Sequence, residues 1–240
     1  MKLIAWNLAH QTQERAIKLR FVEAIERLAP DIVTLNEYVH GITREPLLEA
    51  LAHLGLIHVK VSNRVTTNNQ VLVASRQPLQ AGELLGPPTE DGGGESNFLH
   101  VKLPDAHLEI VGVRVPAYES NLVLHDYWQK LATVIRSAKE RNIVFVGDFN
   151  SDPDARRHQG ARYLVALRSE GWHIPTPSGP WSYVSGTRID HAVASPTVTV
   201  SHAEYVAQLG DIELASKSKA TRISDHAALV LQVGATANAL

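Results

Sequence analysis

The sequence predicts one α/β domain in which helices cover strands that are buried on both faces. Short apolar runs, typical of buried strands, alternate with longer amphipathic segments, typical of surface helices. The length of 240 residues is enough for a substantial core. The chain has no internal repeat and no linker long enough to divide it. We therefore expect one domain over residues 1–234 and a flexible tail over 235–240.

The first part of the chain predicts strands and helices in turn. The apolar run Leu3–Trp6 predicts a buried strand. Glu14–Leu28 predicts a helix, because its apolar residues fall on one face and Pro30 ends it. Asp31–Glu37 predicts a second buried strand, and Pro46–Leu54 predicts a short helix.

The middle of the chain predicts strands around one loop. Ile57–Val61 and Val71–Ser75 are typical of strands. Pro87–Gly94 predicts a loop, and by its composition it is the segment most expected to be disordered. Phe98–Leu103 and Leu108–Val115 predict an antiparallel pair.

The last part predicts the longest helix, over Leu122–Arg141, and a strand over Ile143–Val146 that stops at a polar segment, Gly147–Asn150. The remaining predicted elements are a helix near Ala161–Ser169 and strands at Ile189–Ala194, Val198–Tyr205 and Ala227–Val233.

Charge and composition exclude several classes of site. Lys and Arg number 23 and Asp and Glu 25, so the net charge is −2 and only a local basic cleft could attract nucleic acid. The chain has no cysteine, which excludes disulfides, thiolate nucleophiles and cysteine–zinc sites. Its start is too polar for a signal peptide, and no apolar stretch is long enough to span a membrane. We expect a cytoplasmic protein with no membrane contact and no obligate protein partner.

Polar residues lie at one end of several predicted buried strands. Three early strands end in polar residues, and two late strands begin with them. These residues are Asn7, Glu37, Asp148 and Asn150 in the early group and Asp190-His191 and Asp225-His226 in the late group. If the late strands run opposite to the early ones, all five clusters meet at one edge. Carboxylates packed together repel unless a cation neutralises them or some are protonated. Oxygen ligands with few imidazoles suit Mg²⁺ or Mn²⁺, the usual metals of phosphoryl chemistry.

Ordinary structural roles compete with this interpretation. Asp and Asn are favoured in turns, so Asp148 alone is as consistent with a turn as with a site. A lone histidine such as His226 is more often a hydrogen-bonded structural residue than a ligand. Glu37 is less ordinary, because glutamate is unusual directly after a buried strand. The hypothesis depends on the recurrence of such clusters at strand ends.

Five motifs resemble the endonuclease/exonuclease/phosphatase superfamily of deoxyribonuclease I-like and exonuclease III-like enzymes. They are "AWN", "LNEY", "VFVGDFN", "RIDHAVAS" and "SDHAAL", in the order of that superfamily from Asn7 to His226. The resemblance implies a four-layer α/β/β/α sandwich with two packed mixed sheets and a metal-dependent phosphoesterase activity.

The resemblance also implies roles for these residues. Glu37 would be the principal metal ligand, with Asn7 and Asp225 completing the metal environment. Asp148 would orient or deprotonate the attacking water, and Asn150 would hold a phosphate oxygen or orient Asp148. His226 would donate to a phosphate oxygen, with its tautomer fixed by Asp190.

Two positions depart from the pattern of the superfamily. Many of its nucleases have an acidic residue two positions after the first Asn, where this chain has Ala9. The Tyr or His of the middle strand is replaced by Arg114, which can bind a phosphate oxygen but cannot donate a proton at neutral pH. Protonation of the leaving group would then fall to water held by the metal or to Tyr118. The alternative for Arg114 is a solvated charge at a strand end.

The substrate is less constrained by the sequence. Trp181 and Tyr183 precede the Arg-Ile-Asp strand as in exonuclease III-like nucleases and could stack on a base or an abasic sugar, although aromatic residues also pack in cores. Arg156, Arg157 and His158 could meet a phosphate backbone or be a solvated helix start. We expect a nuclease first, either an endonuclease or an exonuclease. The alternatives are a phosphatase or phosphodiesterase acting on a small molecule or lipid headgroup, and a non-catalytic binding module.

Overall fold

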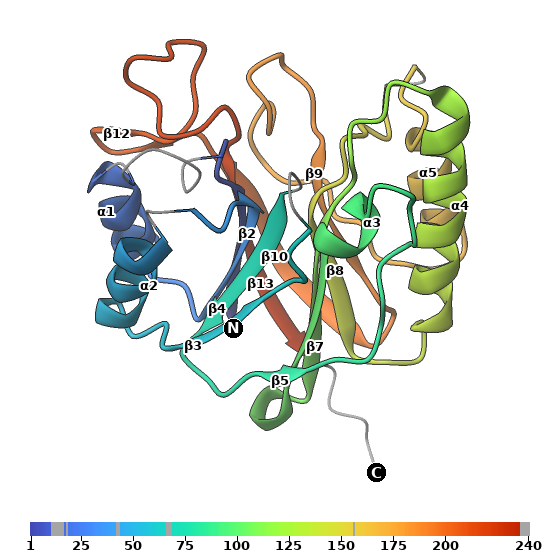
Figure 1. The fold of residues 1–240 in the computed structure, drawn as a ribbon, viewed down its shortest axis with the longest axis horizontal. Coiled ribbons are helices and arrows are strands. Elements are labelled where there is room, and N and C mark those ends of the chain that lie inside the picture. Colours follow the sequence, from blue (N-terminus) through green and yellow to red (C-terminus); the bar gives the residue numbers. More distant parts are fainter. Residues whose placement is uncertain (11–16, 18, 42–43, 66–68, 156, 236–240) are drawn as a thin grey trace.

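The computed structural model describes residues 1–10, 17, 19–41, 44–65, 69–155 and 157–235. Two sheets pack face to face, and helices cover their outer faces (Figure 1). Helices α1 (Leu19–Leu28) and α2 (Arg44–His53) cover one sheet, and α4 (Asn121–Ser137) and α5 (Ala161–Ser169) cover the other. The predicted four-layer α/β/β/α sandwich is confirmed.

The six-stranded sheet combines both ends of the chain, in the order β10-β13-β1-β2-β4-β3. Strands β1 and β2 are parallel, and β13 runs antiparallel to β1. The bounds are Lys2–Asn7 for β1, Ile32–Tyr38 for β2, His58–Val61 for β3, Gln70–Ser75 for β4, Val198–Val206 for β10 and Ala228–Ala235 for β13.

The five-stranded sheet comes from the middle of the chain, in the order β5-β6-β7-β8-β9. Its bounds are Gln80–Ala81 for β5, Phe98–Leu103 for β6, Leu108–Arg114 for β7, Ile143–Asp148 for β8 and Asp190–Ala194 for β9. Strands β6 and β7 form the predicted antiparallel pair, and β8 is parallel to β7 and antiparallel to β9.

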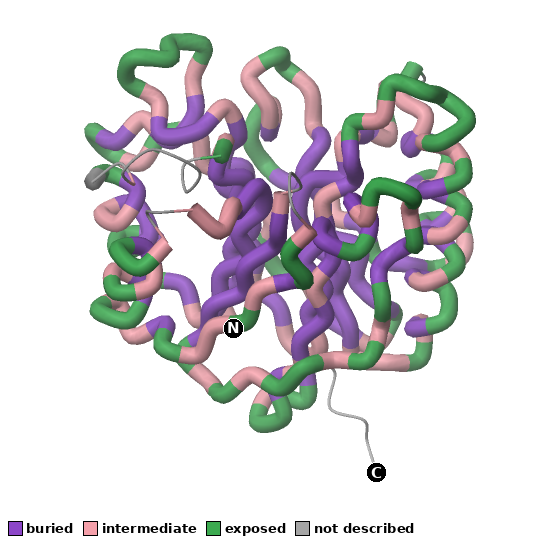
Figure 2. Tube along the Cα trace, viewed as in Figure 1, coloured by how far each residue is buried: buried purple, intermediate pink, exposed green. Residues whose placement is uncertain are grey.

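Three apolar clusters hold the layers together. One lies between the sheets and includes Leu3, Val73, Val144 and Leu229. A second packs α1 and α2 on the six-stranded sheet, and a third packs α4 and α5 on the five-stranded sheet. Figure 2 shows the strands as the buried centre and the helices as partly exposed covers. Strands covered on both sides must be apolar along their whole length, which explains the continuous runs in the sequence.

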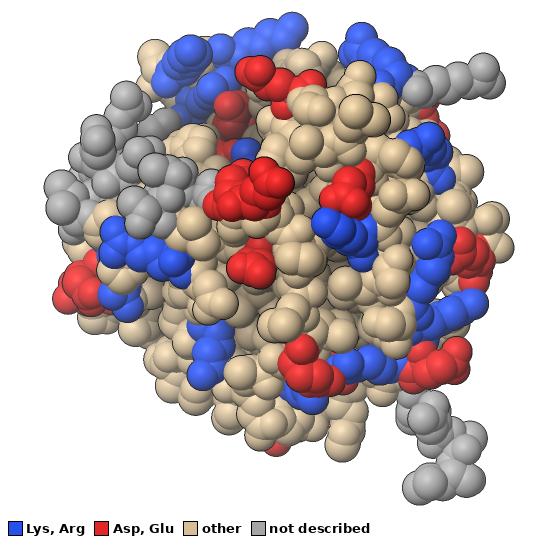
Figure 3. All heavy atoms as spheres, turned by 45° about the vertical axis from the view of Figure 1, so that its right-hand side comes forward, with Lys and Arg blue, Asp and Glu red and all other residues tan. Residues whose placement is uncertain are grey.

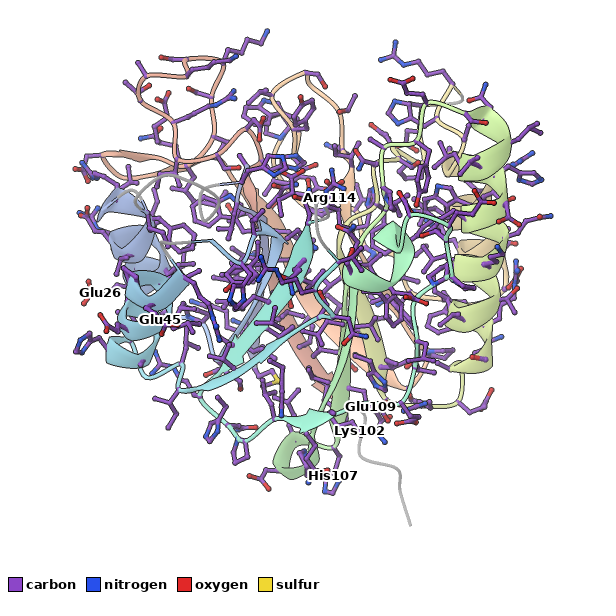
Figure 4. The ribbon with its side chains drawn as sticks, in the orientation of Figure 1. Glu26, Glu45, Lys102, His107, Glu109 and Arg114 are labelled. Carbon is purple, nitrogen blue, oxygen red and sulfur yellow. The ribbon has the colours of Figure 1, made fainter. Side chains whose placement is uncertain are left out.

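The strand directions bring the polar strand ends together. Strands β1, β2 and β8 end at the same side of the sandwich at which β9 and β13 begin, because β9 and β13 run antiparallel to their neighbours. We call this side the polar edge; it lies at the top of Figure 1. Figure 4 shows Arg114 towards this edge, whereas Lys102 and Glu109 lie near the opposite end of the five-stranded sheet.

Several details differ from the sequence-based expectations. The segment Pro87–Gly94, expected to be a disordered loop, runs into a short helix, α3 (Gly93–Ser96), and side chains of the segment hold its backbone. The first helix begins at Leu19; residues 14–16 and 18 lie outside the described residues. Ala235 ends β13 rather than starting a tail, and 236–240 also lie outside. A small hairpin, β11 (Gln208–Leu209) with β12 (Ile212–Glu213), was not expected.

The helices of the described residues offer no candidate for a membrane span, since none combines sufficient length with sufficient apolar character.

Candidate active site at the polar edge

Three side-chain contacts join the two sheets at the polar edge. In each contact, one partner belongs to the six-stranded sheet or the segment leading into it, and the other belongs to the five-stranded sheet. The pairs are Asn7 Nδ2 with Asp148 Oδ2 at 3.1 Å, Arg114 Nε with Glu37 Oε1 at 3.0 Å, and His226 Nδ1 with Asp190 Oδ2 at 2.9 Å. The structure thus brings together residues from the ends of six strands, β1, β2, β7, β8, β9 and β13.

Asp148 ends β8 in a buried position shaped by the preceding glycine. Gly147 has φ +136°, and a Cβ there would lie 2.2 Å from the carbonyl oxygen of Val113, so only glycine fits. The Asp148 carboxylate accepts hydrogen bonds from Asn7 Nδ2 and from the Asn150 backbone N–H. Burial raises the pKa of Asp148 to about 6, with His226 opposing the rise and Asp190 adding to it. A carboxylate with this pKa can accept a proton near neutral pH.

Asn150 turns the chain directly after Asp148. Its backbone has φ +47°, a left-handed conformation that asparagine tolerates better than most residues. Its side-chain Nδ2 donates to the carbonyl oxygen of Val115 at 2.6 Å. The side chain of Asn150 is therefore held beside Asp148, between the ends of β7 and β8.

Glu37 lies at an irregular point of β2. The register between β2 and β4 shifts between Leu35 and Tyr38, and Glu37 has φ +54°. Strained backbone of this kind is concentrated at functional sites. Glu37 is 9% exposed; burial opposes its charge, but Arg114, His10 and Asn7 hold the pKa of Glu37 below its usual value. It is therefore an anion at neutral pH.

His10 is a residue of the site that the sequence did not reveal. Its Nε2 lies 3.1 Å from Glu37 Oε2, on the carboxylate oxygen that Arg114 does not contact. Ala9 and His10 both have positive φ, and the Ala9 N–H donates to Asn7 Oδ1. The only signal in the sequence was its position three residues after Asn7.

His226 is the most enclosed histidine of the site. Its ring Nδ1 contacts Asp190. Its backbone carbonyl oxygen accepts a hydrogen bond from Trp6 Nε1, and its backbone N–H donates to Ser224 Oγ. Burial lowers the pKa of His226, but Asp190, through charge and hydrogen bond, outweighs it and raises the value to about 9. The Tyr183 ring lies with its centroid 4.9 Å from that of His226. His226 is therefore protonated at neutral pH.

Oxygen donors for a divalent cation are present at this edge. Asn7 interacts with the carboxylate of Glu37, and Ser224 Oγ donates to the Asn7 backbone, which brings the segment containing Asp225 close to β1. Carboxylate and amide oxygens suit Mg²⁺ or Mn²⁺ in type. Asp225 pairs with Arg222 at 3.4 Å. Across the described part of the chain, no three or more Asp, Glu or His side chains form a group that could hold a metal.

The other candidate residues take varied positions. Trp181 is partly buried and packs against the cluster between the sheets, whereas Tyr183 lies at the site beside His226. Tyr118 donates from its hydroxyl to Asp91 Oδ1 at 3.1 Å. His158 accepts from the Asp152 backbone N–H, which gives it a structural role; Arg156 lies outside the described residues.

Comparisons with known proteins identify a family and a shared fold. A family model described as the Endonuclease/Exonuclease/phosphatase family matches residues 4–226. Similar solved structures include an AP endonuclease from Archaeoglobus fulgidus, at 17% identity and TM-score 0.71, covering 97% of this chain and 98% of that chain. A 3′ phosphatase from Neisseria bound to a product DNA hairpin also matches, at 17% identity and TM-score 0.69, with coverage of 97% and 98%.

The human Nocturnin catalytic domain with bound sulfate is a further similar structure, at 15% identity and TM-score 0.66, covering 98% of this chain and 94% of that chain. At such identities the likeness shows a shared fold. No match was found among curated proteins.

Proposed function

The chain belongs to the endonuclease/exonuclease/phosphatase family, and from this premise we propose that it hydrolyses phosphodiester bonds, with nucleic acid as the first candidate substrate. Members of the family are phosphoester hydrolases and generally depend on a divalent metal. The observation that carries the proposal is the polar edge itself. There a carboxyl group of pKa about 6 and an imidazolium of pKa about 9 lie in one buried cluster with Glu37.

The two titrating residues suit opposite tasks in one reaction. Asp148 takes a proton from a water molecule, whose oxygen forms a bond to phosphorus while the bond to the leaving oxygen breaks, and the leaving oxygen takes a proton from a second water molecule. His226, charged and held by Asp190, donates a hydrogen bond to a phosphate oxygen as negative charge develops there. We assign water as the nucleophile, because the chain has no cysteine and no serine in a recognisable base-paired motif.

The donors of the site suit a divalent metal, Mg²⁺ or Mn²⁺, by their type, although the described residues hold no preformed group of three Asp, Glu or His ligands. Glu37, Asn7 and Asp225 would hold it. When bound, it offsets negative charge on the phosphate oxygens. Arg114 and Asn150 would bind the remaining phosphate oxygens, and Tyr183, which lies beside His226, would contact the group attached to the phosphate.

Two features bear on the substrate. Nucleic acid is supported by two of the similar structures, an AP endonuclease and a 3′ phosphatase bound to a product DNA hairpin. A small phosphoester is supported by the net charge of −2 and by the surface in Figure 3, where basic and acidic side chains are interspersed. The second candidate function is therefore a phosphatase or phosphodiesterase for a small molecule or lipid headgroup. One domain over residues 1–234 and a cytoplasmic location remain predictions.

A substrate panel tests the proposal. Plasmid DNA, a duplex with an abasic site, single-stranded DNA and bis(p-nitrophenyl) phosphate are each incubated with Mg²⁺, Mn²⁺ or EDTA, with Asp148→Ala as the inactive reference. We expect cleavage of at least one nucleic acid, lost in EDTA and in the variant. Hydrolysis of the small ester alone would place the second candidate first, and activity that EDTA leaves unchanged would refute a metal mechanism.

A further inference from the structure

Arg114 and His10 occupy both oxygens of Glu37. Arg114 Nε and Nη2 each lie 3.0 Å from Oε1, and His10 Nε2 lies 3.1 Å from Oε2. The side chains of Arg114 and Glu37 are only 14% and 11% exposed, so this ion pair is shielded from water. The charge of Glu37 is thus offset by Arg114, a cation of the protein itself, although Glu37 is the principal candidate metal ligand.

A metal ion and the Arg114 guanidinium compete for the same carboxylate. Two cations on one carboxylate would repel each other strongly at this burial. The neighbouring side chains add no negative charge for the metal, because Asn7 is neutral and Ala9 has no polar side-chain atom that could act as a ligand. A divalent ion that binds Glu37 through Oε1 must therefore displace the guanidinium from it.

A bound phosphate would offer the displaced guanidinium a second anionic partner. Arg114 is the register partner of Asp148 in the parallel pair β7–β8, so it lies beside the residue that we assign to the attacking water. A phosphate between Asp148 and His226 would lie next to Arg114. The planar guanidinium binds phosphate with two parallel hydrogen bonds, which compensates for the lost contacts to Glu37.

We propose that Arg114 couples the binding of the phosphate group to the binding of the metal. Without substrate, Arg114 holds Glu37 and weakens its affinity for a divalent ion. A phosphate draws the guanidinium away and leaves the carboxylate to the metal. This proposal rests on the proposed function for the identity of the anion, and it assigns to Arg114 a positioning role in addition to phosphate binding.

The coupling must be reciprocal, because it is a property of the equilibrium between two arrangements of Arg114. Phosphate tightens metal binding by the same factor by which metal tightens phosphate binding; such factors are typically about 5- to 150-fold. His10 provides an internal contrast. It contacts the other oxygen of Glu37 and is 49% exposed, so its removal should free that oxygen for the metal and strengthen metal binding without abolishing the coupling.

Calorimetric titration of Mn²⁺ into the full chain tests the coupling without measuring turnover. Each protein is titrated with and without dimethyl phosphate, a phosphodiester probe without a good leaving group. The proteins are the wild type, Arg114→Met, Arg114→Lys, His10→Gln and the control Arg136→Met, whose arginine pairs with Glu170 away from the site. Circular dichroism confirms that each variant is folded.

In the wild type and Arg136→Met, dimethyl phosphate should lower the dissociation constant for Mn²⁺ by about 5-fold or more. Arg114→Met should bind Mn²⁺ more tightly than the wild type without the diester, and the diester should then have no effect. Arg114→Lys should keep part of the coupling, and His10→Gln should keep all of it. Equal effects of the diester on the wild type and Arg114→Met, or none on the wild type, would overturn the proposal.

The outcome separates this inference from the proposed function. Hydrolysis in the substrate panel without coupling in the titration would remove the role of Arg114 and leave the proposed function intact. Coupling in the titration without hydrolysis of any phosphodiester would support the role of Arg114 and refute the proposed function.

Discussion

The Nδ1 atom of His226 lies 2.9 Å from the Oδ2 atom of Asp190, and both side chains are almost fully buried. The contact connects the segment before β13 with the first residue of β9, and therefore joins the two sheets. Because Asp190 outweighs the cost of burial, the pKa of His226 rises to about 9. The protein thus keeps a positive imidazolium at a place where phosphate charge would develop.

Replacing Asp190 by Asn should impair catalysis and change its pH dependence. His226 would lose its charged partner, and its pKa would fall from about 9 towards its ordinary value. Since the protonated form is the active one, activity of the wild type declines as pH rises through about 9, and in Asp190→Asn this decline should begin at lower pH. At neutral pH we expect a loss of about 10²- to 10⁴-fold.

The measurement is kcat/KM for a phosphodiester across the pH range, with Asp126→Asn as control. Asp126 pairs with Lys130 on the exposed side of α4. A falling limb at the same pH in Asp190→Asn and the wild type would contradict the assignment of His226 as the acidic group.

Glu37→Gln should weaken metal binding and raise the metal concentration that activity requires. The neutral amide is a poorer ligand for a hard cation than the carboxylate. We expect the Mn²⁺ concentration that gives half-maximal activity to rise by about tenfold or more. Loss of a residue that only supports a metal ligand typically weakens metal affinity by about 10- to 100-fold, and loss of a ligand should weaken it at least as much. The matched control is Glu26→Gln, whose glutamate lies on α1 and is labelled in Figure 4. Identical metal titration curves for Glu37→Gln and the wild type would exclude Glu37 as a ligand.

Gly147→Ala should destabilise the protein and displace Asp148. The new Cβ would meet the Val113 carbonyl oxygen at 2.2 Å, in a backbone conformation that alanine disfavours. Gly186→Ala is the control, since Gly186 also has positive φ but has no atom within 4 Å of its added Cβ. In urea unfolding, Gly147→Ala should lose about 2 kcal/mol or more, and clearly more than the control. Equal losses would mean that the close approach to Val113 is unimportant.

His191 should make the folded state sensitive to acid. It is buried, with Nε2 2.9 Å from the Ser151 carbonyl oxygen, and burial lowers its pKa below the ordinary value. The unfolded chain therefore binds the proton first, so His191 costs stability as pH falls through about 6.5. Unfolding free energies between about pH 7.5 and pH 5.5 should fall less steeply in His191→Gln than in the wild type.

The matched control for this prediction is His53→Gln, which changes an exposed histidine at the end of α2. It should keep the slope of the wild type. If His191→Gln also keeps that slope, proton binding at His191 does not contribute to acid sensitivity.

Elements with a strong apolar pattern could be predicted from the sequence. The bounds expected for the strand Phe98–Leu103 and the helix Ala161–Ser169 are those of β6 and α5. Strands such as β8 are recognisable because burial on both faces requires an unbroken apolar run. The segment containing α3 could not be predicted, because Asp91 and Thr89 fix its glycines through local hydrogen bonds that composition does not reveal.

The polar edge could be predicted in its members but not in its contacts. Clusters at strand ends identified Asp148, Glu37 and His226, because strand direction alone brings such ends together. The contact of Arg114 with Glu37 depends on how the two sheets pack, and His10 reaches Glu37 only through a left-handed backbone. Neither property is encoded in a local pattern.

The most direct test of metal-dependent phosphodiester hydrolysis at Asp148 is the initial rate of p-nitrophenol release from bis(p-nitrophenyl) phosphate with Mn²⁺, for the wild type and Asp148→Asn. Asparagine keeps the shape of the side chain but cannot accept the proton of the attacking water. We expect turnover by the wild type that EDTA abolishes and a rate about 10³-fold lower in Asp148→Asn. Equal rates for the two proteins, or a wild-type rate that EDTA leaves unchanged, would contradict the proposed mechanism.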